Sequence, residues 1–262
     1  MLNRNNKTVM LFYIPKIKYD IIKKEVPMKL IIKNLTKSYG EKTILKDIDF
    51  TFEEGKIYGL IGRNGAGKTT FFNCLNEDIE IDSGKFILSD EYGENKLKTE
   101  DIGYVISTPT VPEFLTGKEF LTFFLEINKD KMKDEKTIDD YFDLVKISKE
   151  DQDKLLKEYS HGMKNKMQML INFIANPKVL LLDEPLTSLD IVVQEEMKQV
   201  LKNMKKDHIL IFSTHILELA LDLCDEIVIL NNKKLELVEK SNLNMKKYKN
   251  KIIDCLKEEE NV

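Results

Sequence analysis

Arginine is scarce in this chain of 262 residues, in which Arg4 and Arg63 are the only two. Nearly all of its 41 basic residues are therefore lysines, and 45 acidic residues bring the formal net charge to −4. Proteins that read nucleic acids usually present a basic surface and use the bidentate guanidinium group to recognise bases. The composition therefore gives no reason to expect a nucleic-acid partner.

Cysteine is also rare. Cys74, Cys224 and Cys255 are odd in number, lie far apart and form no C-x-x-C pattern. They fit reduced thiols of a cytosolic protein better than a disulfide framework. Long apolar runs are missing as well, because no segment approaches the roughly eighteen apolar residues of a membrane helix. The chain is not expected to span a membrane.

Residues 1–27 do not have the pattern of a folded domain. Their apolar patch at residues 9–14 is short, and no small-residue cleavage site follows it, which argues against a signal peptide. The codons for residues 24–28 can contain a ribosome-binding sequence before Met28. We therefore hypothesise that the protein begins at Met28 and that residues 1–27 are translated leader. Mass spectrometry of the natively expressed protein tests this, and an intact N-terminus at Met1 would contradict it.

The most informative stretch is a glycine-rich loop that matches G-x-x-x-x-G-K-[ST]. A predicted strand, residues 56–61, enters the loop, and a predicted helix, residues 69–75, leaves it. Glycines let backbone N–H groups turn toward phosphates, and the helix N-terminus adds positive potential. We expect Lys68 to reach the β- and γ-phosphates and Thr69 to bind Mg²⁺. The loop comprises Gly62, Arg63, Asn64, Gly65, Ala66, Gly67, Lys68, Thr69 and Thr70.

Strands and helices alternate on both sides of this loop, which predicts an α/β fold. Residues 179–182 form a continuous apolar strand of the kind buried in a parallel sheet. Further core strands are predicted at residues 209–212 and 226–230, with helices at 191–204 and 217–223 between them. In the N-terminal part, strands are predicted at residues 29–33, 44–53 and 85–88.

Residues 100–176 are predicted to be helical. Thr116 with Glu119 forms a capping box, and Thr137 with Asp140 indicates a second helix start. Ser160 precedes a helix with apolar residues at helical spacing, which ends at Asn176. Residues 241–262 are predicted to form a charged helix or a solvated tail.

Two acidic residues, Asp183 and Glu184, follow the apolar strand at 179–182. The carboxyl ends of parallel strands face the crevice in which ligands bind. Asp183 is therefore a candidate Mg²⁺ ligand, and Glu184 a candidate for polarising the attacking water. The alternative is two acids in a turn before Pro185, but the phosphate loop upstream favours the catalytic interpretation.

From about Met28 to Glu239, the order of these motifs resembles the nucleotide-binding subunit of ATP-binding cassette (ABC) transporters. The resemblance implies a P-loop NTPase parallel-sheet core, an N-terminal antiparallel β subdomain and an inserted helical subdomain at about 100–176. The ATPase domain would span residues 28–240. The resemblance also implies that Tyr39 stacks on adenine, the alternative being local packing in a turn. Residues 188–190, including Asp190, match the D-loop, and His215 matches the histidine that contacts the γ-phosphate.

The signature motif of the family, usually L-S-G-G-Q, corresponds to residues 159–163, Y-S-H-G-M. Ser160 and Gly162 keep the hydroxyl and the bare backbone N–H that close over a γ-phosphate held by the opposite subunit. The resemblance therefore implies a head-to-tail dimer with two shared ATP sites. His161 and Met163 are expected to modify the rim of the site.

A second departure is Ser107, which stands where the family has a glutamine that senses Mg²⁺. A shorter side chain can act through a bridging water, so Ser107 is kept as a candidate metal contact. The resemblance as a whole implies a Mg²⁺-dependent ATPase at the cytoplasmic face of a bacterial membrane. Its partners would be an integral-membrane permease and a second ATPase subunit, identical or not.

The compact single cassette looks like bacterial exporters of drugs, bacteriocins or antimicrobial peptides, which is an analogy at the level of the fold. Two alternatives remain. One is a soluble ABC ATPase that acts on RNA–protein assemblies, which the single cassette and the acidic charge disfavour. The other is a nucleotide-gated regulatory subunit with little turnover, for which Ser107 is the clue.

Overall fold

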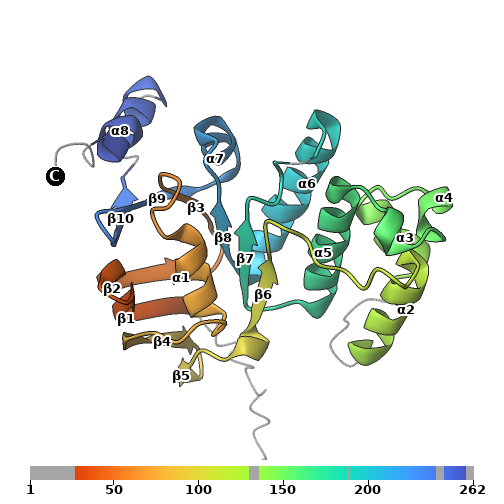
Figure 1. The fold of residues 1–262 in the computed structure, drawn as a ribbon, viewed down its shortest axis with the longest axis horizontal. Helices are drawn as coiled ribbons and strands as arrows, with labels where there is room; N and C mark the ends of the chain where they lie inside the picture. Colours follow the sequence, from red (N-terminus) through yellow and green to blue (C-terminus); the bar gives the residue numbers. More distant parts are fainter. Residues whose placement is uncertain (1–26, 130–135, 188, 240–244, 258–262) are drawn as a thin grey trace, which may run out of the picture.

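The computed structural model describes residues 27–129, 136–187, 189–239 and 245–257. The predicted leader lies outside these residues except for its last position. Two sheets and eight α-helices make up the described chain, with the helices covering the parallel sheet and extending to one side of it (Figure 1).

The larger sheet has six strands in the order β10-β9-β3-β8-β7-β6. Five run parallel and β10 pairs antiparallel with β9. Every residue of β3, β7 and β8 is buried, as the continuous apolar strand pattern predicts for a parallel sheet covered on both faces. The strands are β3 (Ile57–Ile61), β6 (Ile102–Val105), β7 (Val179–Asp183), β8 (Ile209–Ser213), β9 (Glu226–Asn231) and β10 (Lys234–Val238).

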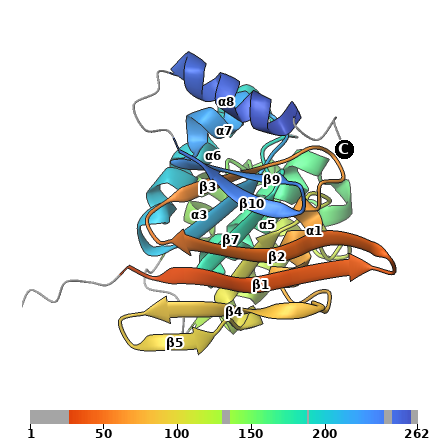
Figure 2. The ribbon, with the colours of Figure 1, turned by 90° about the vertical axis from the view of Figure 1, so that its left-hand side faces the viewer.

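The smaller sheet is antiparallel, with the order β2-β1-β4-β5, and lies beside the first sheet (Figure 2). Its inner face contributes Phe52, which packs on Tyr58 of β3 and on Phe71 of α1. These aromatic contacts fix the small sheet against the start of the phosphate-loop helix. The strands are β1 (Lys29–Tyr39), β2 (Lys42–Glu53), β4 (Ser83–Asp90) and β5 (Gly93–Lys96).

The helices divide into those that flank the parallel sheet and a group at one end of it. Helices α2, α3 and α4 form that end, and α5 connects it to the sheet by packing on β6 (Figure 1). The helices are α1 (Lys68–Leu75), α2 (Gly117–Ile127), α3 (Ile138–Leu144), α4 (Lys149–Gln152), α5 (His161–Ala175), α6 (Ile191–Met204), α7 (Leu217–Leu223) and α8 (Met245–Lys257).

The predicted helix caps are confirmed. In α2, the Thr116 hydroxyl accepts a hydrogen bond from the backbone N–H of Glu119, whose carboxylate accepts one from the N–H of Thr116. Thr137 caps α3 in the same way, and Ser160 caps α5. Helix α5 ends at Asn176 in the left-handed conformation, with a φ of 52°.

The predicted helical region begins too early, because Ile102–Val105 is a strand, β6, that pairs with β7. A segment of four residues is too short for its apolar pattern to distinguish a strand from one turn of a buried helix. Strands β5 and β10 were not predicted. All four residues of β5 are exposed, so they lack the alternation of a half-buried strand.

The solvated-tail interpretation of residues 241–262 is wrong for the described part. Helix α8 buries Tyr248 and Ile252 against a cluster that includes Ile61, Ile229 and Val238. Many residues of α8 are charged and lie on its other face. The composition of the segment therefore gave no indication of the narrow apolar stripe, about one residue per turn, that packs on the fold.

Candidate functional site

Three of the predicted motifs meet at one edge of the parallel sheet. Strands β3, β7 and β8 are parallel neighbours, so their carboxyl ends lie at the same edge. The phosphate loop follows β3, Glu184 follows β7, and His215 follows β8. This edge is where open α/β sheets bind their ligands.

Lys68 is the first residue of α1, and its side chain turns back into the phosphate loop. Its ammonium group donates hydrogen bonds to the carbonyl oxygens of Gly62 at 2.8 Å and Arg63 at 3.3 Å. Burial lowers the pKa of Lys68, an effect that the negative charges of Glu184 and Asp183 oppose. The buried cation is thus held at the centre of the loop, in a position to bind anionic groups.

Gly67 shows why the loop requires glycine. Its φ of 108° lies in the left-handed region, and a Cβ atom would lie 2.6 Å from Cγ2 of Ile44 on β2. A side chain here would be strained and would clash with the small sheet. Ile44 is therefore a wall of the site that sequence reasoning missed, and the motif offered no signal for it, because the contact joins the phosphate loop to a strand of the other sheet.

The Asp183 carboxylate connects three elements. Its Oδ2 accepts a hydrogen bond from the Thr69 hydroxyl at 3.0 Å, and its Oδ1 accepts one from the Ser213 hydroxyl. Asp183 is buried with 3% of its surface exposed, so these bonds compensate for its desolvation. Ser213, the last residue of β8, was not predicted as part of the site, although its position directly before Thr214 and His215 was the available signal.

Glu184 is paired with His215. Nδ1 of His215 lies 2.8 Å from Oε1 of Glu184, although 31 residues separate them. Glu184 has a φ of 52°, a left-handed conformation that is strained for a residue other than glycine. Its backbone N–H donates to the carbonyl of Ser213 at 3.2 Å, which helps to hold this conformation. The turn directs the carboxylate toward the end of β8 rather than along β7.

A cavity of about 400 Å³ lies between these groups. Of the predicted residues, it is lined by Asn64, Gly65, Gly67, Lys68, Thr69, Thr70, Ser107, Asp183 and Glu184, and Ile44 completes it. The structure therefore brings Ser107 to the same cavity as Thr69 and Asp183.

The donor set of this cavity fits Mg²⁺ with a phosphate ligand. Within the described part of the chain, no three His, Cys, Asp or Glu side chains gather as a metal cage. Mg²⁺ needs no such cage, since it retains waters and binds through one or two protein oxygens plus the phosphates. The oxygens of Thr69 and Asp183 are suitable ligands, and Lys68 supplies the positive charge for the phosphates.

The other predicted residues lie outside this cavity in the single chain. Ser160 and Gly162 are at the start of α5, and Asp190 caps α6 by accepting a hydrogen bond from the N–H of Val193 at 3.0 Å. Gly62 and Arg63 line a separate cavity, and the N–H of Ala66 donates to the carbonyl of Arg63. Ser188 lies outside the described residues.

Tyr39 ends β1, and half of its surface is exposed. The ammonium group of Lys37 lies 5.0 Å from the centre of its ring, at a distance typical of a cation–π contact. Tyr39 does not line the 400 Å³ cavity, although Ile44, which follows it in the same hairpin, does.

Tyr159, the first residue of the predicted signature motif, packs against the start of α2. Its ring is buried, and its hydroxyl donates to the carbonyl of Asp151 at 2.8 Å. A Cβ atom at Gly117 would lie only 2.1 Å from that hydroxyl, so the glycine leaves the space that the larger side chain needs. The ring thereby packs the starts of α2 and α5 together.

Asn165 links α5 to the loop that contains Glu184. Its side-chain N–H donates to the carbonyl of Pro185 at 2.6 Å, and the residue is 1% exposed. Sequence reasoning missed it, because an asparagine inside a helix gives no signal of a contact twenty residues away.

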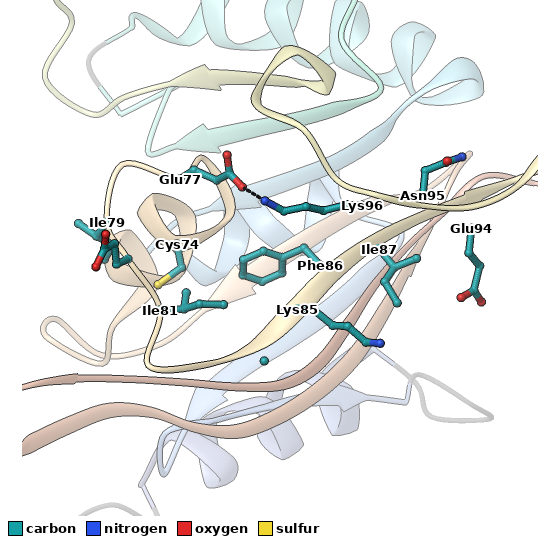
Figure 3. Close-up of a pocket in the computed structure, with 12 residues that line it drawn as sticks. Cys74, Glu77, Ile79, Ile81, Lys85, Phe86, Ile87, Glu94, Asn95 and Lys96 are labelled. Atoms are coloured by element: carbon teal, nitrogen blue, oxygen red, sulfur yellow. Dashed lines mark ion pairs between the residues drawn. The ribbon is translucent and has the colours of Figure 1, made fainter.

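A larger cavity of about 730 Å³ lies elsewhere, beneath β4 and β5 and the end of α1 (Figure 3). Apolar side chains of Ile79, Ile81 and Phe86 line it, and Glu77 and Lys96 form an ion pair of 2.9 Å at its edge. Burial raises the pKa of the Cys74 thiol beside them to about 11, so the thiol stays protonated at neutral pH. None of the predicted site residues lines this cavity.

The fold and the phosphate-loop site define a P-loop NTPase of the ABC type. The family model described as ABC transporter matches residues 45–187. The chain is 34% identical to an uncharacterized ABC transporter ATP-binding protein, YxlF of Bacillus subtilis, over 78% of this chain and 68% of that protein. It is 33% identical to the lantibiotic transport ATP-binding protein SrtF of Streptococcus pyogenes, over 75% of this chain and 84% of that protein. The chain therefore belongs to the ATP-binding proteins of the ABC transporter family.

A solved structure shares the fold. The ATP-binding cassette MJ0796, in a dimeric post-hydrolysis state bound to ADP and phosphate, superposes with a TM-score of 0.65 at 21% identity. The match covers 79% of this chain and 96% of that one. The combination of an antiparallel sheet, a parallel sheet and an inserted helical group is thus that of an ABC ATPase.

Proposed function

We propose that this protein binds ATP with Mg²⁺ in the 400 Å³ cavity and hydrolyses it to drive transport through a separate membrane permease. The observation that carries the proposal is the arrangement of Lys68, Thr69, Asp183 and Glu184 around one cavity. In it, a buried cation and the loop N–H groups bind phosphates, and Thr69 and Asp183 hold the metal. When bound, Mg²⁺ neutralises charge on the phosphates.

Glu184 and His215 supply the remaining chemistry. The Glu184 carboxylate orients the attacking water and accepts its proton, while His215 holds that carboxylate by the 2.8 Å contact of its Nδ1. Donation to the terminal phosphate from the other ring nitrogen requires the ring to carry both protons. The strained turn at Glu184 brings its carboxylate to the cavity and within reach of His215, which follows β8 and lines the adjacent cavity.

A second ATPase subunit completes the site in this proposal. Ser160, Gly162 and Asp190 do not line the cavity of their own chain, which fits a role toward the site of a partner. The related cassette MJ0796 is a dimer in its solved structure. We expect closure on ATP binding and reopening after hydrolysis.

An integral-membrane permease is the proposed second partner, at the cytoplasmic face of a bacterial membrane. Among the described helices, none is long and apolar enough to cross a bilayer. Helix α2 exposes Phe123 and Ile127, which lie four residues apart on one face and offer a contact surface. The lantibiotic transport relative supports export of an antimicrobial peptide, a bacteriocin or a drug as the specific activity.

The test is a mild-detergent pull-down of the tagged protein from its native membranes, followed by identification of what co-purifies. We expect a stoichiometric protein with several membrane spans, whose own sequence would narrow the cargo. Recovery of ribosomal proteins instead would favour an ABC ATPase of RNA–protein assemblies. Mg²⁺-dependent turnover of the purified protein separates the transporter ATPase from a regulatory subunit with little turnover, the interpretation that Ser107 favours.

A further inference from the structure

Helix α8 is fixed to the rest of the fold at both ends. The Tyr248 hydroxyl donates to the carbonyl of Val238 at 3.1 Å, and the Asn231 side chain donates to the carbonyl of Cys255 at 2.7 Å. Lys249 also forms an ion pair with Glu218 of α7. Figure 2 shows the helix lying over α7 and the β9–β10 edge. The helix is therefore a packed element with a defined register.

The surface that α8 covers includes the strand that leads into the phosphate loop. Ile61, the last residue of β3, packs in the same cluster as Tyr248 and Ile252, and both of these are almost fully buried. Gly62, the first residue of the phosphate loop, follows Ile61 directly. A shift of α8 would therefore alter the packing of Ile61, directly before the start of the loop.

Leu256, in the last turn of α8, lies next to the site itself. Together with Ile61, Gly62, Arg63, Asn64 and His215, it lines a cavity of about 460 Å³. Asn64 also lines the phosphate cavity, so the two cavities share a wall. Leu256 brings an apolar side chain from the end of the described chain to the outer side of both the phosphate loop and His215.

The His215 ring is exposed and is held at one atom. Its side chain is 51% exposed, and its Nδ1 is held by Glu184 alone among the contacts that the structure shows for it. A ring with one anchoring atom can rotate, and small misplacements of a reacting group are costly in rate. Leu256 lines the cavity that the ring also lines, so its apolar side chain limits the space into which the ring can turn without competing for its nitrogens.

We propose that Leu256 of α8 is a positioning residue for ATP hydrolysis, which acts by restraining His215 and the adjacent part of the phosphate loop. This inference rests on the proposed ATPase function. Lys68, Thr69 and Asp183 do not line the Leu256 cavity, so the contacts proposed for the terminal phosphates and the metal stay in place when Leu256 is changed. Its effect falls on the hydrolysis step.

The test compares Leu256→Ala with Leu256→Met and with the control Tyr248→Phe. The control removes the hydrogen bond at the far end of α8 without changing the residues that line the cavity of Leu256 and His215. We expect Leu256→Ala to lower kcat about five-fold or more, with KM for ATP unchanged within about two-fold, because only the positioning of the reacting groups is disturbed. Leu256→Met restores kcat by refilling the space, and Tyr248→Phe lowers the unfolding midpoint while kcat stays as in the wild type.

A second measurement follows the surroundings of position 256 by fluorescence and does not require ATP turnover. The sequence contains no tryptophan, so Leu256→Trp introduces a single fluorescent reporter. We expect its emission to shift when ATP and Mg²⁺ are added in a Glu184→Gln background, because the loop and His215 rearrange beside it.

The outcomes separate the inference about Leu256 from the proposed ATPase function. An active wild type with unchanged kcat in Leu256→Ala overturns the inference while leaving the ATPase function intact. Equal losses in Leu256→Ala and Tyr248→Phe also overturn it, because they show that α8 contributes only stability. A wild type that binds ATP but never hydrolyses it contradicts the proposed function itself, and the inference with it.

Discussion

The hydroxyl of Thr69 donates a hydrogen bond to Oδ2 of Asp183 at 3.0 Å, across 114 residues of sequence. This contact joins the phosphate loop to the end of β7, and Ser213 holds the other oxygen of the same carboxylate from β8. Helix α1 and strands β7 and β8 thus fix the two oxygen donors that Mg²⁺ would use.

Removal of the Thr69 hydroxyl should therefore weaken Mg²⁺ binding more than it weakens nucleotide binding. We expect Thr69→Ala to raise the Mg²⁺ concentration for half-maximal ATPase activity by about ten-fold or more. Thr69→Ser, which keeps the hydroxyl, should remain close to the wild type. A Mg²⁺ titration of phosphate release measures both, and a wild-type titration curve for Thr69→Ala would contradict the assignment.

Lys68 should be essential for nucleotide binding. Its ammonium group is buried, and the hydrogen bonds that the structure shows for it go to loop carbonyls, so bound phosphates would complete its charge balance. Loss of a buried charged partner typically costs about 2–5 kcal/mol, so we expect Lys68→Ala to weaken ATP binding by at least about thirty-fold. Calorimetric titration with ATP measures this. Lys118→Ala, an exposed lysine on α2, is the matched control and should bind as the wild type does.

Ser107 lines the cavity that holds Thr69 and Asp183, so its short side chain can reach the metal through a water. We expect Ser107→Ala to raise the half-maximal Mg²⁺ concentration by about three-fold, a smaller change than that of Thr69→Ala, because a bridging water contributes less than a direct ligand. If the Mg²⁺ dependence and turnover of Ser107→Ala equal those of the wild type, Ser107 has no metal role.

Asn165 should stabilise the loop that contains Glu184. Its donation to the Pro185 carbonyl is buried, and loss of a buried hydrogen-bond partner costs about 1–3 kcal/mol. We expect Asn165→Ala to lower the free energy of unfolding by that amount in a urea titration. Asn172→Ala removes the side-chain hydrogen bond to the carbonyl of Gln168 in the same helix and should cost less, because a carbonyl inside α5 also accepts the helical bond from the N–H four residues on. A larger loss in Asn172→Ala would contradict this account.

Local chemical patterns account for what the sequence could predict. The phosphate loop depends on glycines and a lysine at fixed spacing, and the capping boxes at Thr116 and Thr137 involve residues three positions apart. The buried strand β7 is apolar at four consecutive positions, which placed Asp183 and Glu184 at its end. These features are readable because all the interacting groups lie within a few residues.

The remainder required contacts between distant segments. The wall formed by Ile44, the bond from Asn165 to Pro185 and the docking of α8 each join elements that no local pattern connects. Strand β6 is recognised only by its pairing with β7, since four residues carry too little periodicity. The left-handed turn at Glu184 is likewise set by the sheet edge rather than by a preference of glutamate for that conformation.

The most direct test of the account is phosphate release from ATP by the purified wild type and by Glu184→Gln, with ATP binding measured in parallel. We expect Mg²⁺-dependent release by the wild type and a loss of about a hundred-fold or more in Glu184→Gln, which should still bind ATP, because only the proton acceptor is removed. Hydrolysis by Glu184→Gln at the wild-type rate would contradict the assignment of Glu184 and, with it, the proposed site of hydrolysis.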